Sequence, residues 1–187
     1  MMTPTIRDIA YQLRQGKMIA LADETGWSLA VDPVNDTAVA QLLSLANRIP
    51  AGLKPTVLIQ HADQLGLYVL KLPDIAFDLV EFAENPLTVV YDQGKNISLL
   101  VWQDGASGEM GNLMAGEVSV RRTLNTDIQR LIGSFGRGLL TLPLESLTIP
   151  ADAESLVSER FGTLPGMPKR PRIMRLKANG EVSFIRK

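Results

Sequence analysis

Two adjacent carboxylates, Asp23 and Glu24, lie in a short polar segment between two apolar runs and are followed by Thr25 and Gly26. Paired carboxylates at the end of a strand could bind Mg²⁺, which favours one or two carboxylates together with substrate phosphates. The same residues are also ordinary turn formers. The sequence leaves both interpretations open and favours the turn.

Basic side chains occur at two places where they could bind phosphate. Arg48 and Lys54 flank the segment 49–53, between a predicted helix end and a predicted buried strand. Phosphate-bearing ligands commonly bind at such sheet ends, although Arg48 could equally complement a helix dipole. Arg121 ends another apolar strand beside Arg122. The two must face opposite sides of the sheet, so one of them could point into a cleft.

The composition excludes several kinds of chemistry. The chain has no cysteine and one histidine, His61, which excludes thiol nucleophiles, iron–sulfur clusters, cysteine zinc sites and His-rich metal sites. We expect His61 to begin a helix or lie on the surface. No Gly-x-x-x-x-Gly-Lys-Ser/Thr loop is present. Gly133, Gly136 and Gly138 follow a predicted helix, so we interpret them as its end. Carboxylates, hydroxyls, Lys, Arg and backbone remain, with no resident metal predicted.

Charge is distributed unevenly along the 187 residues, whose net charge is −1. Residues 167–187 contain seven basic residues and one acidic residue, whereas residues 1–166 contain twelve basic and nineteen acidic residues. An acidic body with a basic C-terminal strip points weakly to phosphate or nucleic acid. The alternative, which we favour, is a solvated strand pair with outward charges. The candidates for nucleic-acid contact are Lys169, Arg170, Arg172, Arg175 and Lys177.

Hydrophobic periodicity and turn residues predict interleaved helices and strands. The expected helices span residues 5–15, 36–47, 74–84, 125–135 and 152–161. The expected strands span residues 17–22, 27–31, 56–60, 87–91, 97–102, 117–121 and 138–142, with a final hairpin formed by 172–176 and 181–185. Residues 92–96 are expected to link two strands as a hairpin, and residues 103–116 to form a mobile loop. The pattern predicts an α/β fold with three layers around a mixed sheet.

The length and composition are typical of one compact domain, so we expect residues 1–187 to form a single domain that includes or carries the basic hairpin 167–187. The N-terminus lacks the pattern of a secretory signal, and no apolar run is long enough to span a membrane. We therefore expect a cytoplasmic protein with no membrane contact.

In their order and spacing, several segments resemble the YrdC-like family, which includes the threonylcarbamoyl-AMP synthases and their YciO relatives. Residues 16–33 resemble the family's opening strand and Pro-Thr-Glu-Thr-like turn. Residues 45–59 resemble its Lys-x-Arg block with the following Lys-Pro and strand. Residues 84–90 resemble its Pro-Gly-Pro-x-Thr block, and residues 116–126 the strand that ends in the family's Arg. The matching positions are Glu24, Thr25, Trp27, Leu29, Asp32, Arg48, Lys54, Pro55, Pro86, Thr88 and Arg121.

The resemblance implies a YrdC/RibB-like fold, in which a twisted mixed sheet is flanked by helices. It further implies a cleft that binds ATP, with Mg²⁺, and threonine, uses bicarbonate, and makes threonylcarbamoyl-adenylate for a tRNA modification. Double-stranded RNA binding is also attributed to the domain. The implied substrate or nucleotide contacts are Glu24, Thr25, Arg48, Lys54, Thr88 and Arg121, with ATP a substrate and no tightly bound cofactor.

The sequence departs from the family pattern at positions that bear on activity. Ala22 and Asp23 replace the first Pro-Thr of the turn, and Ala46 replaces the Lys of Lys-x-Arg. The Ser-x-Ala-Asn positions fall on residues 142–145, where Glu145 adds a carboxylate. Asp23 and Glu145 would repel phosphate unless Mg²⁺ intervened. We therefore expect a divergent nucleotide- or RNA-binding domain, a pseudoenzyme without full synthase activity. The alternatives are an active synthase and a non-catalytic interaction module.

Overall fold

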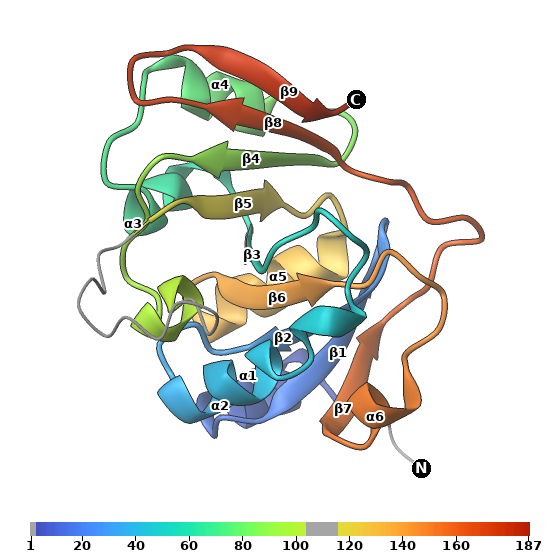
Figure 1. Ribbon diagram of the computed structural model, residues 1–187. Coiled ribbons are helices and arrows are strands. Elements are labelled where there is room, and N and C mark those ends of the chain that lie inside the picture. Colours follow the sequence, from blue (N-terminus) through green and yellow to red (C-terminus); the bar gives the residue numbers. More distant parts are fainter. Residues whose placement is uncertain (1–2, 104–115) are drawn as a thin grey trace.

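The computed structural model describes residues 3–103 and 116–187. Its centre is a nine-stranded mixed sheet, shown in Figure 1, in the order β7-β1-β2-β6-β3-β5-β4-β8-β9. The strands are β1 (Met18–Asp23), β2 (Gly26–Val31), β3 (Thr56–Ile59), β4 (Leu87–Tyr91), β5 (Val118–Arg122), β6 (Leu139–Pro143), β7 (Val157–Gly162), β8 (Arg172–Leu176) and β9 (Val182–Arg186).

Helices flank this sheet and complete the expected layered α/β fold. They are α1 (Ile6–Arg14), α2 (Asp36–Leu43), α3 (Leu65–Tyr68), α4 (Ile75–Glu81), α5 (Thr126–Phe135) and α6 (Ala151–Glu154), with 3₁₀ turns at Ala46–Arg48, Ala62–Gln64 and Leu99–Trp102. The prediction of a mixed sheet between helical layers is confirmed. In the described residues, no helix is both long and apolar enough to cross a membrane.

Alternate residues of the central strands enter two separate cores. Ile19 and Leu21 of β1 pack with α1 and α5, whereas Ala20 and Ala22 join the larger core that contains residues of α2, α3 and α4. All six residues of β1 are therefore buried, as expected for a strand covered on both faces. The side chains of β3 alternate between the two cores in the same way, and Leu58 belongs to the α1/α5 core.

The α1/α5 core does not extend across the whole sheet. It contains Leu58 of β3 and Leu139 of β6, but no residue of β4, β5 or β8. On those three strands, the side chains that point to the opposite face of the sheet, such as those of Val89, Val120 and Met174, belong to the other core. A part of one sheet face, reaching from β6 to β8, is thus left to line a cleft.

Several predicted elements are confirmed together with their end signals. The first helix begins at the N-cap Thr5 with a capping box to Asp8, and α5 ends at Gly136 in the left-handed conformation, as the glycine pattern predicted. The C-terminal hairpin also forms as predicted. The predicted helix 36–47 is shorter, because α2 ends at Leu43 and a 3₁₀ turn covers Ala46–Arg48.

Two predicted elements are wrong. Residues 97–102 do not form a strand, because Ser98 caps a 3₁₀ turn through the Leu100 N–H, and β4 pairs with β5 and β8 instead of a following hairpin partner. Residues 152–161 do not form one helix: α6 ends at Glu154, and β7 pairs in parallel with β1. Most of the predicted mobile loop 103–116 lies outside the described residues.

Candidate functional site

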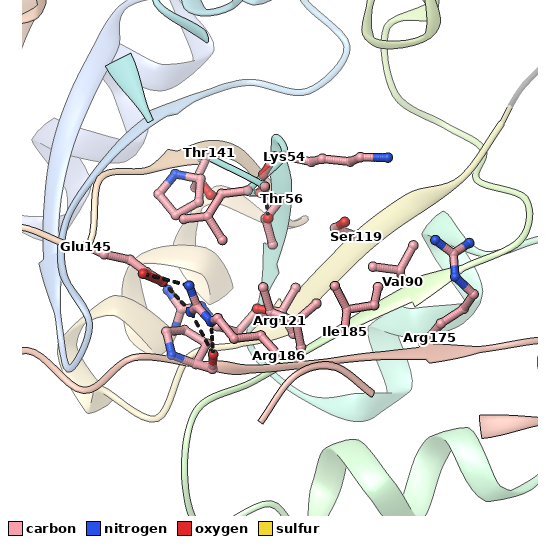
Figure 2. A pocket seen from close by; sticks show the side chains of 16 residues that line it. Lys54, Thr56, Val90, Ser119, Arg121, Thr141, Glu145, Arg175, Ile185 and Arg186 are labelled. Atoms are coloured by element: carbon pink, nitrogen blue, oxygen red, sulfur yellow. Dashed lines mark hydrogen bonds and ion pairs between the residues drawn. The ribbon is translucent and has the colours of Figure 1, made fainter. Parts of the chain in front are cut away.

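A cavity of about 140 Å³ lies on the uncovered part of the sheet face, and Figure 2 shows its lining. Four neighbouring strands each contribute one small hydroxyl residue: Thr141 from β6, Thr56 from β3, Ser119 from β5 and Thr88 from β4. Hydroxyls can donate and accept hydrogen bonds, so this floor suits a polar ligand. The four hydroxyl residues lie side by side because β6, β3, β5 and β4 are neighbours in the sheet.

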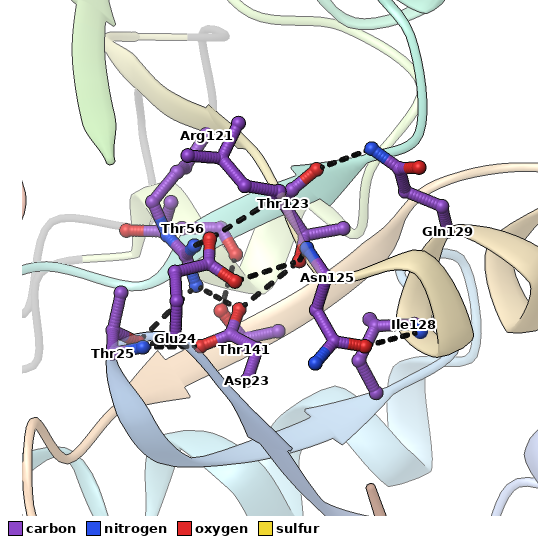
Figure 3. A network of polar contacts seen from close by, with 11 residues as sticks. Asp23, Glu24, Thr25, Thr56, Arg121, Thr123, Asn125, Ile128, Gln129 and Thr141 are labelled. Carbon is purple, nitrogen blue, oxygen red and sulfur yellow. Dashed lines mark hydrogen bonds and ion pairs between the residues drawn. The ribbon is translucent and has the colours of Figure 1, made fainter. Parts of the chain in front are cut away.

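Arg121, at the base of this cavity, is held by two carboxylates from the turn between β1 and β2 (Figure 3). Its side chain is 3% exposed, and its guanidinium lies 2.7 Å from Asp23 Oδ2 and 3.0 Å from Glu24 Oε1. Thr25 Oγ1 donates to Asp23 Oδ1 at 2.7 Å. Burial opposes the charge of Arg121, but the carboxylates of Asp23 and Glu24 outweigh it, and the pKa of Arg121 is raised.

The same carboxylates are tied to the start of α5. Glu24 Oε1 accepts the Leu124 N–H at 2.9 Å, and Thr123 Oγ1 donates to Asp23 Oδ2 at 3.3 Å. Thr123 Oγ1 also accepts the N–H of Asn125, the N-cap of α5. The turn after β1, the end of β5 and the first turn of α5 are therefore joined through one polar network.

This network settles how Asp23 acts in the fold. We expected Asp23 to repel phosphate unless Mg²⁺ intervened, but Arg121 pairs with it at 2.7 Å and offsets one of the two negative charges of Asp23 and Glu24. The Asp23 and Glu24 oxygens are engaged by Arg121 and by Thr25, Thr123 and Leu124. The turn interpretation fits these contacts. Among the described residues, no group of three or more His, Asp or Glu could hold a metal ion.

Glu145 and Arg186 form a second ion pair at one wall of the cavity. Both oxygens of Glu145 accept from the Arg186 guanidinium, at 3.0 and 2.5 Å, and Arg186 also donates to the Pro171 carbonyl at 2.7 Å. The Glu145 side chain is 6% exposed, and its backbone has a φ of +50°. The last strand, β9, is thereby joined to the segment after β6, and Arg186 balances the charge of Glu145.

Lys54 and Arg175 line the more exposed side of the cavity and share one carboxylate. Lys54 Nζ lies 3.6 Å from Glu117 Oε2, and Arg175 pairs with Glu117 Oε1. The hydrogen bond from Arg175 and the charges of Arg175 and Lys54 hold the pKa of Glu117 below its ordinary value. Two cations against one carboxylate leave a net positive charge on this side.

The predicted substrate contacts are only partly brought together. Lys54, Thr88 and Arg121 line the cavity. Glu24 and Thr25 do not line the cavity, and their side chains instead accept hydrogen bonds from Arg121. Arg48 pairs with Asp152 at 2.8 Å on the surface and does not line the cavity.

The predicted nucleic-acid contacts do not share one face of the sheet. Arg175 lines the cavity, whereas Arg172, three residues earlier on β8, stacks over Phe184 on the other side, 5.1 Å from the ring centroid. Lys177 pairs with Glu181, and the Arg170 guanidinium lies 3.6 Å from Glu145. The Lys169 backbone N–H donates to the Glu24 carbonyl. Two carboxylates outside the strip, Glu117 and Glu145, thus offset part of its charge.

Sequence reasoning missed several lining residues. Thr56, Ser119 and Thr141 are single small hydroxyl residues within otherwise apolar strands, and that pattern was the available signal. Arg186 was counted in the basic strip but not placed at the cleft. No local pattern indicates its pairing with Glu145, which is 41 residues away in the chain.

The cavity itself is small for a drug-sized ligand. Ligand pockets for drug-sized molecules commonly measure roughly 300–1,000 Å³, against about 140 Å³ here. Lys54 and Arg175 offer charge for a phosphate or carboxylate, and the hydroxyl floor offers hydrogen bonds.

Known proteins resemble this chain in sequence and in fold. Residues 11–142 match the Sua5/YciO/YrdC family model, described as "Telomere recombination". The threonylcarbamoyl-AMP synthase of Halorhodospira halophila is 30% identical over 162 residues, covering 84% of this chain and 78% of that protein. The enzyme of the same name from Blochmanniella pennsylvanica is 27% identical over 167 residues, covering 86% and 79%.

Two solved structures show the same fold at low sequence identity. E. coli YciO superposes with a TM-score of 0.71 at 18% identity, covering 97% of this chain and 88% of that one. P. abyssi Sua5 complexed with L-threonine gives 0.67 at 21% identity, covering 91% and 50%. The family match extends over more than two thirds of the sequence, and it includes Lys54, Thr88 and Arg121, which line the cavity. The chain belongs to the Sua5/YciO/YrdC family.

Proposed function

We propose that this chain is a YrdC-like domain that binds a nucleotide or a related small anion in its cleft without carrying out the complete threonylcarbamoyl-AMP synthase reaction. The observation that carries the proposal is the Glu145–Arg186 pair. The resemblance implies that the family's hydroxyl and amide groups fall at residues 142–145, and here Glu145 with its bound Arg186 lines the cavity wall. Arg186 is thereby committed to Glu145 and Pro171 and is not available to a ligand phosphate.

The cationic side of the cleft supports the binding part of the proposal. Lys54 and Arg175 share Glu117, so a ligand phosphate or carboxylate can compete with Glu117 for either cation. Such competition replaces one charge-assisted hydrogen bond by another. Arg121 is fully committed to Asp23 and Glu24, so its contribution to ligand binding is to hold the floor of the cavity in place.

An activity assay tests the catalytic part. The purified protein is incubated with ATP, threonine and bicarbonate in the presence of Mg²⁺, and threonylcarbamoyl-adenylate is measured by mass spectrometry. We expect no steady product formation. The Halorhodospira halophila relative, assayed in parallel, serves as the positive control. Steady turnover by the present chain would overturn the proposal and favour the alternative.

Calorimetric titration with ATP tests the binding part. We expect the Lys54→Ala variant to bind ATP at least several-fold more weakly than the unaltered chain, since Lys54 lines the cavity. The matched control is Lys71→Ala, which removes an exposed lysine that does not line it. No ATP binding at millimolar concentration, or an equal loss in both variants, would contradict a nucleotide role.

An active synthase is the second candidate. Two observations favour it. Both similar proteins are named threonylcarbamoyl-AMP synthase, and Lys54, Thr88 and Arg121 line the cavity. Under this candidate ATP, threonine and bicarbonate are substrates in tRNA modification, and Lys54→Ala lowers turnover while Lys71→Ala does not. The single-domain organisation and the cytoplasmic location stay predictions from the sequence.

A further inference from the structure

The last residues of β9 form one wall of the cavity. Ile185 and Arg186 line it together with Pro171 and Ile173, and Figure 2 shows both β9 side chains among those that surround it. With these residues in place the cavity measures about 140 Å³, below the roughly 300–1,000 Å³ that is common for pockets of drug-sized ligands. The end of β9 is therefore one of the elements that limit the size of a ligand.

A bulge near the end of β9 brings two successive residues to the cavity. Successive side chains of a regular strand point to opposite faces of the sheet. Arg186 pairs with Ile173 of β8, whereas Phe184 already pairs with the next residue of β8, Met174. Ile185 is therefore an extra residue without a partner on β8, and such a bulge can re-aim a side chain. Ile185 and Arg186 consequently both line the cavity.

Side-chain contacts of Arg186 hold this end of the strand against the opposite wall. Within residues 3–103 and 116–187, β9 pairs with β8 alone, so its backbone is attached on one side. Arg186 donates to both carboxylate oxygens of Glu145 and to the Pro171 carbonyl. Its side chain is 21% exposed, so water reaches the ion pair. The strand end can therefore open locally, without unfolding of the whole sheet, once the contacts of Arg186 are broken.

We propose that Ile185 and Arg186 form a strap that closes the cavity, and that a ligand as large as a nucleotide binds when Arg186 has left Glu145. The choice of ligand rests on the function proposed above, whereas the closure of the cavity by the strap is a separate property. When only a fraction of the molecules is open, the apparent affinity for the ligand falls in proportion to that fraction. The Glu145–Arg186 pair therefore weakens nucleotide binding while it is formed.

Both charges of the pair must be removed together to test the strap. Loss of Arg186 alone would leave Glu145 as an unpaired carboxylate in the cavity wall, which would itself repel a phosphate. The double variant Glu145→Gln with Arg186→Met removes the ion pair and leaves the net charge unchanged. The matched control is Asp152→Asn with Arg48→Met, which removes a surface ion pair that does not line the cavity.

A cysteine on the cavity floor measures the opening without any ligand. The natural chain has no cysteine, and Ser119 lines the cavity and is 6% exposed. We expect the Ser119→Cys thiol to react with iodoacetamide, a small neutral reagent, at least several-fold faster in the double variant, and at an unchanged rate in the control pair. Ser98→Cys, at a residue that is 5% exposed and lies outside the cavity, should keep its rate in both. Equal acceleration at both cysteines, or none at Ser119→Cys, would overturn the proposal.

A smaller change in β9 tests the strap without altering any charge. Ile185→Ala shortens a side chain that lines the cavity, whereas Val182→Ala shortens a similarly exposed apolar side chain of the same strand that does not line it. We expect Ile185→Ala to accelerate labelling of the Ser119→Cys thiol and Val182→Ala to leave the rate unchanged. Circular dichroism confirms that each variant is folded. Equal effects of the two alanines would show that hairpin stability controls access, and would refute the strap.

Calorimetric titration with ATP connects the strap to the ligand. We expect the double variant of Glu145 and Arg186 to bind ATP at least several-fold more tightly than the unaltered chain, and the control pair to leave the affinity unchanged. Faster labelling of the floor cysteine without ATP binding by either chain would support the strap and contradict the nucleotide role of the cavity. Faster labelling with equal ATP affinity in both chains would show that the strap does not control ligand entry, and would overturn the proposal.

Discussion

At the scale of single residues, the cleft is defined by which charges have partners. Arg121 is buried between Asp23 and Glu24, and Arg186 is bound by Glu145, so both arginines are committed within the fold. Lys54 and Arg175 share one carboxylate and are the cations that we propose a ligand recruits. Charges that appear equivalent in the sequence therefore have different roles.

The Arg121 pair should be essential for stability. Removing one partner of a buried ion pair leaves an uncompensated charge and commonly costs about 3–5 kcal/mol. We expect Arg121→Met to lower the free energy of unfolding by about that amount, measured by urea denaturation. The matched control is Arg48→Met, which removes the surface pair with Asp152, whose side chains are 48% and 46% exposed. That change should cost about 0–1 kcal/mol, and equal losses would contradict the assigned roles.

The Glu117 carboxylate should give the cleft a measurable dependence on pH. Its pKa is lowered from the ordinary value of 4.5, chiefly by the hydrogen bond from Arg175. Its stabilising contribution is then fully present above that ordinary value and is lost as the pH falls through the lowered pKa.

We therefore expect Glu117→Gln to destabilise the chain at pH 7, with the difference from the unaltered chain shrinking as the pH falls below 4.5. Denaturant unfolding at a series of pH values measures this difference. A difference that stays constant down to pH 2 would show that the ion pair with Arg175 contributes nothing.

At the scale of elements, tight turns and strand order place the residues of the site. The turn between β1 and β2 presents Asp23 and Glu24, and its last residue, Gly26, has a φ of +99°. A Cβ atom at Gly26 would lie 2.6 Å from the Ser146 carbonyl oxygen, on the segment after β6. The turn thus needs glycine both for its backbone conformation and for close packing.

Replacing two glycines by alanine separates these two requirements. Gly26 and Gly52 both have positive φ values, +99° and +86°, but a Cβ at Gly52 meets nothing within 4 Å. We expect Gly52→Ala to cost about 1–2 kcal/mol from backbone strain alone, and Gly26→Ala about 1–3 kcal/mol more from overpacking. Thermal and urea unfolding measure both, and similar losses would show that the packing against Ser146 is not limiting.

At the scale of the whole molecule, the basic C-terminal strip is folded back onto the acidic body. Glu145 binds Arg186 and lies near Arg170, Glu117 binds Arg175, and β8 carries Arg172 and Arg175 on opposite faces. The +6 charge that residues 167–187 carry in isolation is therefore partly neutralised. RNA binding is the weaker of the proposed partner classes for this reason.

The remaining charge should still determine how any RNA binding responds to salt. We expect affinity for a double-stranded RNA to fall by roughly one log unit per log unit of salt for each phosphate contacted. Lys169→Ala with Arg170→Ala should reduce the slope, while Lys17→Ala with Lys71→Ala, outside the strip, should not. Fluorescence anisotropy at several salt concentrations measures the slope. Salt-independent binding, or none at low salt, would remove RNA from the candidate partners.

Much of the local structure was predictable, because its signals are local. The capping box at Thr5, the end of α5 at Gly136 and the hairpin turn before β9 all depend on residues within a few positions of one another. The strand β7 and the 3₁₀ turn at Leu99–Trp102 were missed because distant partners determine them. β7 pairs with β1, and Ser98 donates to Asp36.

The sequence by itself determined the chemical inventory: no thiol, one histidine, and a set of carboxylates, hydroxyls and cations with family-like spacing. Only the tertiary structure decided which of them meet. The contact between Arg121 and Asp23 spans 98 residues, and that between Arg186 and Glu145 spans 41. Such pairings depend on strand order and register, which no local pattern encodes, and they make the carboxylates that we expected to repel phosphate into ion-pair partners of Arg121 and Arg186.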